Sequence, residues 1–332
     1  ETTGITLAGM GKKGTTITLK LNNKIANQEG YVITVKPRAI VIEGKTPQGV
    51  FYGVQTLRKS LPVEQTATVN LPVGKVADYP RFGYRGAMLD CARHYFSVPF
   101  VKEYIDVLAL HNINTFHWHL TEDQGWRVEI KRYPKLTEIG SKRAQTVMGN
   151  NTELYDGVPY GGYYTQDEMR DIVKYAAERY ITIIPEIDMP GHMLGALAAY
   201  PEYGCTGGPY KVAERWGVFD DILCAGNPKT YEFVNNILDE LLDIFPSKYI
   251  HLGGDEAPRT RWKACPRCQA EIKRLNLKGS NGFSAEAQLQ SHFMNVIAQH
   301  LATKGRNIIG WDEILEGDVA PGSTVMSWRG ID

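Results

Sequence analysis

The sequence carries no excess charge of either sign. Its 332 residues contain 37 Lys and Arg against 37 Asp and Glu, so the formal net charge is zero. A strongly basic surface that would attract nucleic acid or an anionic membrane is therefore not expected. The chain also lacks any run of about 18 apolar residues, so no segment of it is expected to span a membrane.

Cysteine is scarce, with five residues in the chain. Cys205 and Cys224 flank a loop rich in Gly, Pro and polar residues, which favours a surface disulfide between them. Cys265 and Cys268 form a C-x-x-C, but the sequence shows no second ligand pair at similar spacing, so no metal site is expected there. Cys91 stands in an apolar strand context and is expected to be a buried free thiol.

The organisation of the chain changes near residue 78. Before that point, short β-like runs precede one amphipathic stretch, which is typical of a small α+β domain. The runs are residues 15–21, 31–37 and 39–43, and the amphipathic stretch is 47–61. Residues 69–86 are punctuated by Pro and Gly and are interpreted as a connection. We therefore expect a small α+β domain over residues 1–78 and a larger domain over 79–332.

In the larger domain, apolar strands alternate with amphipathic helices, which indicates a parallel sheet covered on both faces. The chain has no glycine-rich phosphate loop after the first of these strands, which argues against a doubly wound nucleotide-binding sheet. Several strands end in polar clusters, as in an α/β barrel whose C-terminal strand ends form the active face. The predicted strands are 85–90, 113–120, 181–189, 249–256, 307–313 and 324–330, and the predicted helices are 99–112, 165–180, 229–246 and 284–305.

The predicted fold class is therefore α/β, a (β/α)₈ TIM-type barrel preceded by the small α+β domain. The pattern supplies about six strands where a closed barrel of this kind has eight. We expect the C-terminal part of the barrel to be missing, beyond Asp332. The first residue is Glu rather than Met, which indicates a processed or trimmed chain from which any signal peptide is already gone.

Asp255 and Glu256 are adjacent carboxylates at the end of a predicted strand, directly after Gly253 and Gly254. The two glycines permit a bulge or a close backbone approach, so both carboxylates could reach one pocket. One interpretation is that the acidic pair begins a helix. The other is catalysis, although adjacent residues cannot flank a sugar ring, because paired glycosidase carboxylates lie about 5 to 9.5 Å apart. A glycosidase built on this pair needs another nucleophile, such as the 2-acetamido oxygen of the substrate itself.

Several sequence blocks carry a family resemblance, in the order LDCARHYF (89–96), FHWHLTEDQGWRVEI (116–130), PEIDMPGH (185–192) and HLGGDE (251–256). Together they resemble the family 20 glycoside hydrolases, the β-N-acetylhexosaminidases, and the small leading domain is also similar to the one that precedes the barrel in that family. The resemblance implies exo-acting, retaining hydrolysis of terminal β-linked N-acetylhexosamine (GlcNAc or GalNAc) through an oxazolinium intermediate. N-acetylhexosamine-terminated oligosaccharides or glycoconjugates are the implied partners, and no cofactor is implied.

The resemblance also implies roles for individual residues. Glu256 matches the general acid that protonates the glycosidic oxygen and later acts as base, and burial near another carboxylate is expected to raise its pKa. Asp255 matches the residue that orients the acetamido group and stabilises the cationic intermediate. Arg93 matches an arginine that binds the C3 and C4 hydroxyls. A structural ion pair with Asp90 is the alternative for Arg93.

Further matches concern a histidine and two tryptophans. His192 matches a histidine behind the catalytic acid, with Glu122 as its expected partner. The family more often has Asp-Asp where this chain has Glu122-Asp123, so either carboxylate could pair with His192. Trp311 and Trp328, at the ends of the fifth and sixth predicted strands, match two tryptophans that enclose the acetamido methyl, although simple core packing is the alternative. The family's further aromatic wall, tyrosine and acidic site residues would lie beyond the last residue.

Two other function classes stay open at this point. His117 and His119 share one face of a strand, and such an H-x-H begins the metal site of metal-dependent amidohydrolases. His192 and His251 are the candidate further ligands, although His251 is expected well before the end of its strand. A non-catalytic sugar-binding barrel is the third class, and the presence of Glu256 argues against it.

The expected location is outside the cytoplasm, as a periplasmic, cell-surface or secreted protein. This expectation rests on the absent initiator Met, on the predicted Cys205–Cys224 pair and on the polymeric glycans that are typical substrates of the family.

Overall fold

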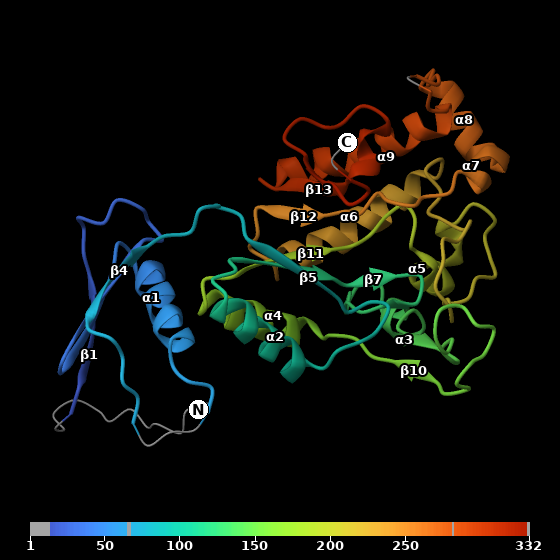
Figure 1. Cartoon of the computed structure of the whole chain (residues 1–332). Helices are drawn as coiled ribbons and strands as arrows, with labels where there is room; N and C mark the ends of the chain where they lie inside the picture. The colour runs from blue at the N-terminus through green and yellow to red at the C-terminus, as the bar shows by residue number, and fades with distance from the viewer. Residues whose placement is uncertain (1–13, 65–67, 281, 331–332) are drawn as a thin grey trace. The chain divides into compact units, whose positions relative to one another are not determined.

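The computed structural model describes residues 14–64, 68–280 and 282–330 (Figure 1). Residues 1–13, at the start of the predicted first domain, therefore lie outside the described residues. The chain divides into two compact units. The first consists of Glu1–Ala87, Lys102–Phe116 and Tyr175–Thr182. The second consists of Met88–Val101, His117–Lys174 and Ile183–Asp332. Within the described ranges, no helix has the length and apolar character needed to cross a membrane.

The first unit contains a four-stranded sheet in the order β1-β3-β2-β4. Its strands are β1 (Thr16–Leu21), β2 (Tyr31–Lys36), β3 (Ala39–Gly44) and β4 (Gly74–Asp78). β1 runs parallel to β3, whereas β2 pairs antiparallel with both β3 and β4. Helix α1 (Pro47–Lys59) begins at Thr46, whose side chain accepts a hydrogen bond from the Gly49 N–H. The helix packs on the sheet around a core of Tyr31, Ile33, Ile40, Ile42 and Tyr52.

Strand β4 was not predicted, because residues 69–86 were interpreted as a connection. All of its side chains are exposed, so the sequence shows no alternation of buried and exposed positions there. The strand exists because its backbone pairs with β2, with Ile33 opposite Val76 in the register. The interpretation as a plain connection was wrong for this reason.

The predicted barrel strands form one six-stranded sheet in the order β5-β6-β11-β12-β13-β14, so each strand lies beside the next one of the set along the chain. The strands are β5 (Gly86–Asp90), β6 (Thr115–His119), β11 (Thr182–Glu186), β12 (Tyr249–His251), β13 (Asn307–Trp311) and β14 (Thr324–Met326). The pairings of β12 with β11 and β13, and of β13 with β14, are parallel. Parallel strands in sequential order are the arrangement of a (β/α) barrel, and the predicted strand set is confirmed.

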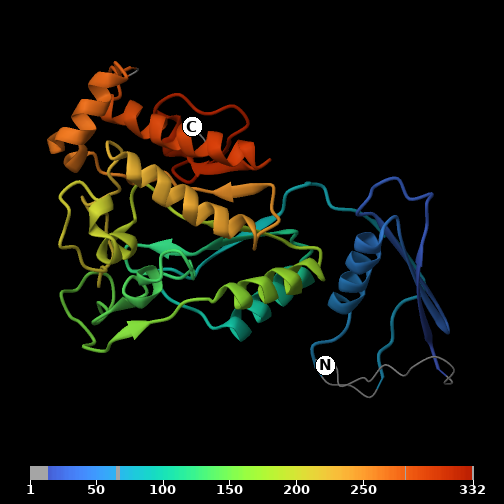
Figure 2. The same ribbon diagram turned by 180° about the vertical axis from the view of Figure 1, so that it is seen from behind.

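Four long helices accompany these strands, as predicted. They are α2 (Val98–Leu110), α4 (Gln166–Ala177), α6 (Pro228–Leu242) and α9 (Ala285–Thr303). α6 begins at Asn227, whose side chain accepts a hydrogen bond from the Lys229 N–H, with Pro228 in the first turn. In the reverse view, α6 and α9 lie side by side, and α9 also contacts β13 (Figure 2).

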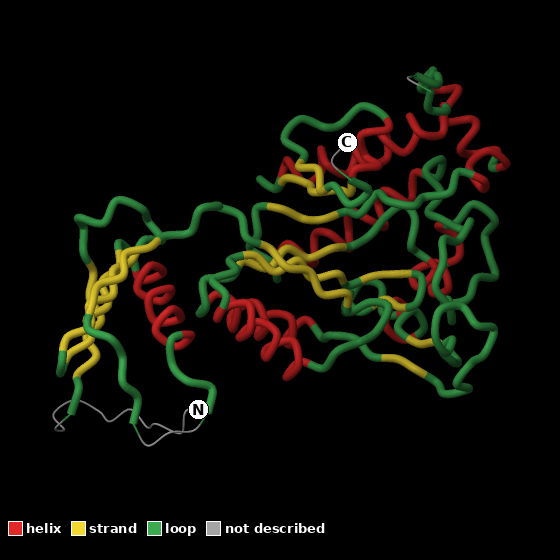
Figure 3. Tube along the Cα trace, in the orientation of Figure 1, coloured by secondary structure: helices red, strands yellow, loops and turns green. Residues whose placement is uncertain are grey.

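Long loops follow the C-terminal ends of the strands and contain short elements (Figure 3). After β6 come β7 (Thr121–Glu122), β8 (Gly125–Trp126), α3 (Lys135–Glu138), β9 (Lys142–Arg143) and β10 (Tyr160–Gly161). After β11 come α5 (Leu194–Ala199) and a 3₁₀ turn (Pro201–Tyr203). After β12 come α7 (Thr260–Ala264) and α8 (Pro266–Arg274), and after β13 a 3₁₀ segment (Asp312–Glu316). These short elements were not predicted. Most of the predicted site residues lie in the loops themselves, whereas Glu122 lies in β7 and Trp311 ends β13.

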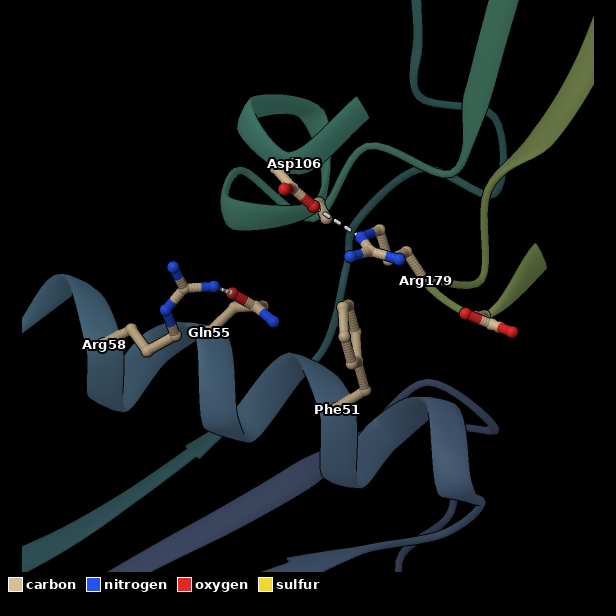
Figure 4. A pocket seen from close by; sticks show the side chains of 7 residues that line it. Phe51, Gln55, Arg58, Asp106 and Arg179 are labelled. Atoms are coloured by element: carbon tan, nitrogen blue, oxygen red, sulfur yellow. Dashed lines mark hydrogen bonds and ion pairs between the residues drawn. The ribbon is translucent and has the colours of Figure 1, made fainter. Parts of the chain in front are cut away.

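The first unit contains a surface pocket. Figure 4 shows Phe51, Gln55 and Arg58 on α1, and an ion pair in which Arg179 Nε lies 2.5 Å from Asp106 Oδ1. Arg58 also donates a hydrogen bond to Gln55 Oε1 at 2.9 Å. None of the residues that line this pocket was predicted as a site residue. The candidate active site is therefore sought at the strand ends of the second unit.

Candidate active site

The chain turns sharply after β12, just before the adjacent carboxylates. Gly253 and Gly254 have φ angles of +67° and +96°, in the left-handed region. A Cβ atom at Gly253 would lie 1.6 Å from Asp188 Oδ1, and one at Gly254 would lie 2.7 Å from Ile314 Cγ2. The two glycines are required because any side chain would be strained and would collide with its neighbours.

The sequence predicted that this strand runs to Glu256, but the turn ends β12 at His251. His251 therefore stands at the end of its strand, which corrects the expectation that it lies well before the end. The left-handed glycines break the extended backbone, so the two carboxylates lie in the loop that follows the strand. Glu256 has itself a φ of +44°, which is uncommon for a residue with a long side chain.

His192 contacts both pairs of adjacent carboxylates. Its Nδ1 lies 3.0 Å from Glu122 Oε2 and 3.0 Å from Asp123 Oδ2, so the two candidate partners are both used. Its Nε2 lies 3.6 Å from Asp255 Oδ2 and 3.5 Å from Glu256 Oε2. Burial by itself would lower the pKa of His192, but the charge of Glu122 and the hydrogen bonds to its carboxylate neighbours raise that pKa well above the usual value. His192 is therefore an imidazolium cation surrounded by carboxylates.

The two adjacent carboxyl groups differ in acidity. Burial is the largest cause that raises the pKa of Asp255, to about 6. His192, whose Nε2 lies 3.5 Å from Glu256 Oε2, is the largest cause that lowers the pKa of Glu256 below its usual value. The sequence led us to expect a raised pKa for Glu256, and this expectation was wrong for the free site. The side chain of Glu256 is 36% exposed, so burial has little weight against the neighbouring imidazolium.

One oxygen of Asp255 is buried without a hydrogen-bond partner among the described residues. This atom is Oδ1, whereas Oδ2 is the oxygen near His192. A buried acceptor left unpaired costs about 1–3 kcal/mol. Asp255 Oδ1 is therefore well suited to accept an N–H or O–H group from a bound molecule.

Arg93 lies in the loop after β5 and forms ion pairs with two carboxylates. Its Nη1 lies 2.7 Å from Asp90 Oδ2 and its Nη2 lies 2.6 Å from Glu122 Oε1. The ion pair with Asp90, which was the structural alternative for this residue, is thus present. The second ion pair connects Arg93 to the carboxylates around His192. A third of the Arg93 side chain is exposed, so a ligand has access to it.

Glu186 is a buried carboxylate at the end of β11 that the sequence analysis did not single out. It contacts His117 Nε2 at 2.6 Å, His119 Nδ1, and His251 Nδ1 at 3.0 Å. Burial would raise its pKa, but the charges of the histidines, that of His119 above all, lower it well below the usual value. Both H-x-H histidines are thus hydrogen-bonded to the carboxylate of Glu186. The sequence feature that could have identified Glu186 is an acidic residue inside an otherwise apolar predicted strand.

Asp188, two residues further on, was also missed. It is fully buried, and its Oδ1 accepts a hydrogen bond from the Gly254 N–H at 3.3 Å. Burial, and then the charge of Asp255, raise the pKa of Asp188 well above the usual value. A neutral Asp188 thus holds the glycine turn in place beneath Asp255.

The two predicted tryptophans have different surroundings. Trp311 ends β13, and its Nε1 donates to Glu186 Oε1 at 3.0 Å. Trp328 lies beyond the end of β14, is 50% exposed, and donates from Nε1 to Glu313 Oε2 at 3.0 Å. The structure thus joins in one network Arg93, Glu122, Asp123, His192, Asp255 and Glu256, with Trp311 attached through Glu186 and its histidines. Trp328 makes no contact with this network among the described residues.

None of the five cysteines forms a disulfide in the structure. Cys91 is buried, as predicted. Cys205 and Cys224 do not form the predicted disulfide, and instead they lie together with Cys265 and Cys268 in one cluster. No second pair stands at similar spacing to the C-x-x-C, but the conclusion that it lacks further ligands was wrong. The second pair comes from a loop that is distant in sequence, so spacing could not reveal it.

Comparison with known proteins agrees with this fold. The family description "Glycosyl hydrolase family 20, catalytic domain" matches residues 82–332, and "Glycosyl hydrolase family 20, domain 2" matches residues 1–79. A beta-hexosaminidase of Porphyromonas gingivalis is 48% identical over 92% of this chain and 38% of its own length. The crystal structure of a beta-N-acetylhexosaminidase from Bacteroides fragilis is 39% identical with a TM-score of 0.79, covering 94% of this chain and 58% of that one. A mutant Streptomyces plicatus beta-hexosaminidase in complex with the product GlcNAc is 34% identical with a TM-score of 0.82, covering 99% and 61%.

The strand order, with the site at the strand ends, defines a protein of the (β/α) barrel class. The chain belongs to glycoside hydrolase family 20. It spans 38% of the length of the Porphyromonas relative and about three fifths of each of the two solved chains.

Proposed function

We propose that the protein removes terminal β-linked N-acetylhexosamine, GlcNAc or GalNAc, from the ends of glycans, with retention of configuration and with the substrate's own acetamido group as nucleophile. The observation that carries the proposal is the position of Asp255 and Glu256. Both carboxylates lie near a single atom, His192 Nε2, at 3.6 and 3.5 Å. A pair on one side of the site cannot flank a sugar ring as acid and nucleophile.

The other carboxylates of the network are held in ways that leave them unsuited as nucleophiles. Glu122 is bound by Arg93 and His192, and Glu186 by three histidines and Trp311. Asp188 is kept neutral by burial. The acetamido carbonyl oxygen of the substrate is then the nucleophile that completes the reaction.

In the proposed first step, this carbonyl oxygen forms a bond to the anomeric carbon while the bond from that carbon to the leaving oxygen breaks. Glu256 donates a proton to the leaving oxygen. Asp255 Oδ1 accepts the acetamido N–H, and the Asp255 carboxylate stabilises the positive charge of the oxazolinium ring. In the second step, water attacks the anomeric carbon, Glu256 takes a proton from the water, and the ring C–O bond breaks to restore the acetamide.

The proton for the first step is stored on His192 in the free protein. Glu256 is a carboxylate there because the imidazolium faces it, with 3.5 Å between Nε2 and Oε2. A bound glycan that covers Glu256 excludes water, and this desolvation raises the pKa of the carboxyl group. Substrate binding thus favours movement of the proton from His192 Nε2 to Glu256 Oε2.

The remaining predicted residues have supporting roles in this proposal. Arg93 is positioned to bind ring hydroxyls through its partly exposed guanidinium. Trp311 encloses the acetamido group from the end of β13, and the exposed Trp328 packs on the sugar from the edge of the site. Glu122 and Asp123 keep His192 protonated and oriented.

We also propose that the protein acts outside the cytoplasm, in the periplasm, at the cell surface or in the medium. The support is the nature of the substrates, since N-acetylhexosamine-terminated glycans are abundant there. The cysteines give no support to this location, because the predicted disulfide is absent. Fractionation of the source cells, followed by immunodetection, tests the location.

The function is tested by assaying the full-length protein on chromogenic β-glycosides of GlcNAc, GalNAc and glucose that share one leaving group. We expect turnover of one or both acetamido sugars and little turnover of the glucoside. Glucoside turnover at a comparable rate would contradict the mechanism, because the 2-hydroxyl cannot replace the acetamido nucleophile. Comparable turnover of a glycoside without the acetamido group, lost on chelation of metals, would favour metal-dependent hydrolysis instead.

A further inference from the structure

Four of the five cysteines gather at one place outside the network described above. Cys205 and Cys224 lie in the loop between α5 and α6, whereas Cys265 precedes α8 and Cys268 lies within it. The sulfur of Cys268 lies 3.8 Å from that of Cys205 and 3.7 Å from that of Cys224. The sulfurs of Cys224 and Cys265 are 3.9 Å apart. All four sulfurs lie within 4.8 Å of one another.

These separations have the length expected around a tetrahedral metal ion. Two sulfurs in a disulfide are about 2.05 Å apart. In a tetrahedral zinc–thiolate site the Zn–S bonds are about 2.3 Å, which places neighbouring sulfurs about 3.8 Å apart, since a tetrahedron's edge is about 1.6 times its centre-to-corner distance. The three sulfur–sulfur separations of 3.7, 3.8 and 3.9 Å match this edge length.

The surroundings of the cluster restrict water. Cys224, Cys265 and Cys268 are buried, and Cys205 is partly exposed. Four protein sulfurs with little solvent access leave no open coordination position for a water or a substrate. This closure is typical of a structural site rather than a catalytic one.

Positive charge also lies beside the sulfurs. Four thiolates around Zn²⁺ leave a net negative charge, which neighbouring groups must stabilise. Arg267, between the two cysteines of the C-x-x-C, donates from Nη2 to Gly204 O at 3.0 Å and to Cys205 O at 3.4 Å, which holds its guanidinium at the cluster.

Gly226 shows how closely the two cysteine-bearing segments approach each other. A Cβ atom at this position would lie 2.3 Å from the carbonyl carbon of Arg267 and 2.4 Å from the backbone nitrogen of Cys268. The loop that carries Cys224 therefore packs its backbone directly on the C-x-x-C. This contact brings two segments that are distant in sequence within reach of one ion.

We propose that Cys205, Cys224, Cys265 and Cys268 bind one structural Zn²⁺ ion. Soft thiolate ligands in a tetrahedral set select zinc over the hard cations Mg²⁺ and Ca²⁺. The first two ligands lie on the loop that follows His192, and the other two lie just after Glu256. The ion thus clamps together the loops that follow β11 and β12, which carry the histidine and the carboxylates of the active site.

The proposal is tested by metal analysis of the full-length protein, prepared without a polyhistidine tag and under reducing conditions. We expect one zinc ion per chain, which a mercurial reagent releases as it modifies the thiols. Cys268→Ser is expected to reduce the zinc content to near zero. Cys91→Ser is the matched control, because Cys91 is a buried cysteine outside the cluster, and this variant is expected to keep its zinc.

Should Cys268→Ser fail to fold, the unmodified protein gives a second test. Exchange of the ion for Co²⁺ is expected to produce thiolate-to-cobalt charge-transfer absorption together with the visible bands of a tetrahedral cobalt site. Removal of the ion by a chelator is expected to lower Tm. The proposal is overturned by protein that contains no zinc, by iron in place of zinc, or by unreduced peptides that link Cys205 to Cys224 or Cys265 to Cys268.

Discussion

His192 Nε2 lies 3.5 Å from Glu256 Oε2, and both residues adopt left-handed backbone conformations, with φ angles of 54° and 44°. The contact places a cation beside the carboxylate that is proposed as the catalytic acid. The two groups therefore titrate as a coupled pair, and the proton that leaves one is available to the other. The predictions below concern this pair, its neighbour Asp255 and the turn that positions them.

Glu256→Gln removes the proton donor and keeps the shape of the side chain. We expect glycosides with poor leaving groups to lose about 10²- to 10⁴-fold in kcat/KM, the usual contribution of general acid–base catalysis. Glycosides whose leaving group departs without a proton should lose much less in the first step. Comparison of kcat/KM across a series of leaving groups checks this, and an equal loss for every leaving group would exclude Glu256 as the acid.

Asp255→Asn is expected to slow all acetamido substrates, including those with activated leaving groups. The reason is that orientation of the acetamido group and stabilisation of the oxazolinium charge are needed whatever the leaving group is. The same leaving-group series, measured beside Glu256→Gln, separates the two roles. If activated substrates were spared by Asp255→Asn as they are by Glu256→Gln, the role assigned to Asp255 would be wrong.

Asp255 is also expected to lower stability at neutral pH. Its pKa is about 6 in the folded protein, against an unfolded value of about 3.9. Between these values the folded state binds more protons than the unfolded state, so this group's contribution to stability falls as pH rises. Asn cannot ionise, and Asp255→Asn should therefore raise Tm at neutral pH, with the gain shrinking toward about pH 4. Thermal unfolding across this pH range provides the check, and a gain that grows as pH falls would refute it.

His192→Gln is expected to raise the pKa of Glu256. The neighbouring His192 is the largest cause that lowers this pKa, and glutamine carries no charge. Carboxyl-carbon NMR of Glu256 in the variant and the unmodified protein measures the shift. His300→Gln is the control, because His300 pairs with Asp239 on the helices and is not part of the network. An unchanged Glu256 pKa in a folded His192→Gln protein would show that the contact does not set the acidity.

Gly253→Ala is expected to lower the free energy of unfolding by more than the cost of placing alanine in the left-handed backbone region. Its φ is +67°, and the added methyl would lie 1.6 Å from Asp188 Oδ1. Gly305→Ala is the matched control, with a similar φ of +73° and no atom within 4 Å of the added methyl. The control should lose about 1–2 kcal/mol from the left-handed backbone alone. Chemical denaturation of both variants measures the difference, and equal losses would mean that Asp188 moves aside freely.

The sequence predicted the long elements of the fold well, for a physical reason. Apolar runs that pack on helices repeat with the period of their secondary structure, so the six barrel strands and four long helices were visible. Strand β4 was not, because its side chains are exposed and only backbone pairing with β2 defines it. Helices α7 and α8 were also missed, because both lie in the loop after β12 rather than in the strand–helix alternation that was followed.

From the residues alone, site residues could be predicted only where their position relative to the end of a strand indicated them. Asp255 and Glu256 were found because they follow a strand closely, and Trp311 because it ends one. The resemblance to a family added Arg93 and His192. The low pKa of Glu256 depends on its distance from His192, which spacing does not give. The cysteine cluster depends on the approach of two loops through Gly226, and no pattern in the sequence encodes that approach.

The left-handed conformations at positions 192 and 256 have a consequence for any randomised library built at these sites. In such a library, the backbone angle alone would already favour some residues over others. Glycine adopts the left-handed region without strain, and asparagine or aspartate does so at a modest cost, whereas β-branched residues are nearly excluded. A screen that scores folded protein would therefore enrich glycine at position 256, whereas a screen for turnover would return glutamate. The yield of folded protein and the activity would thus favour different residues at position 256. Tolerance to mutation, judged by folding, is therefore a misleading guide to the importance of such a position.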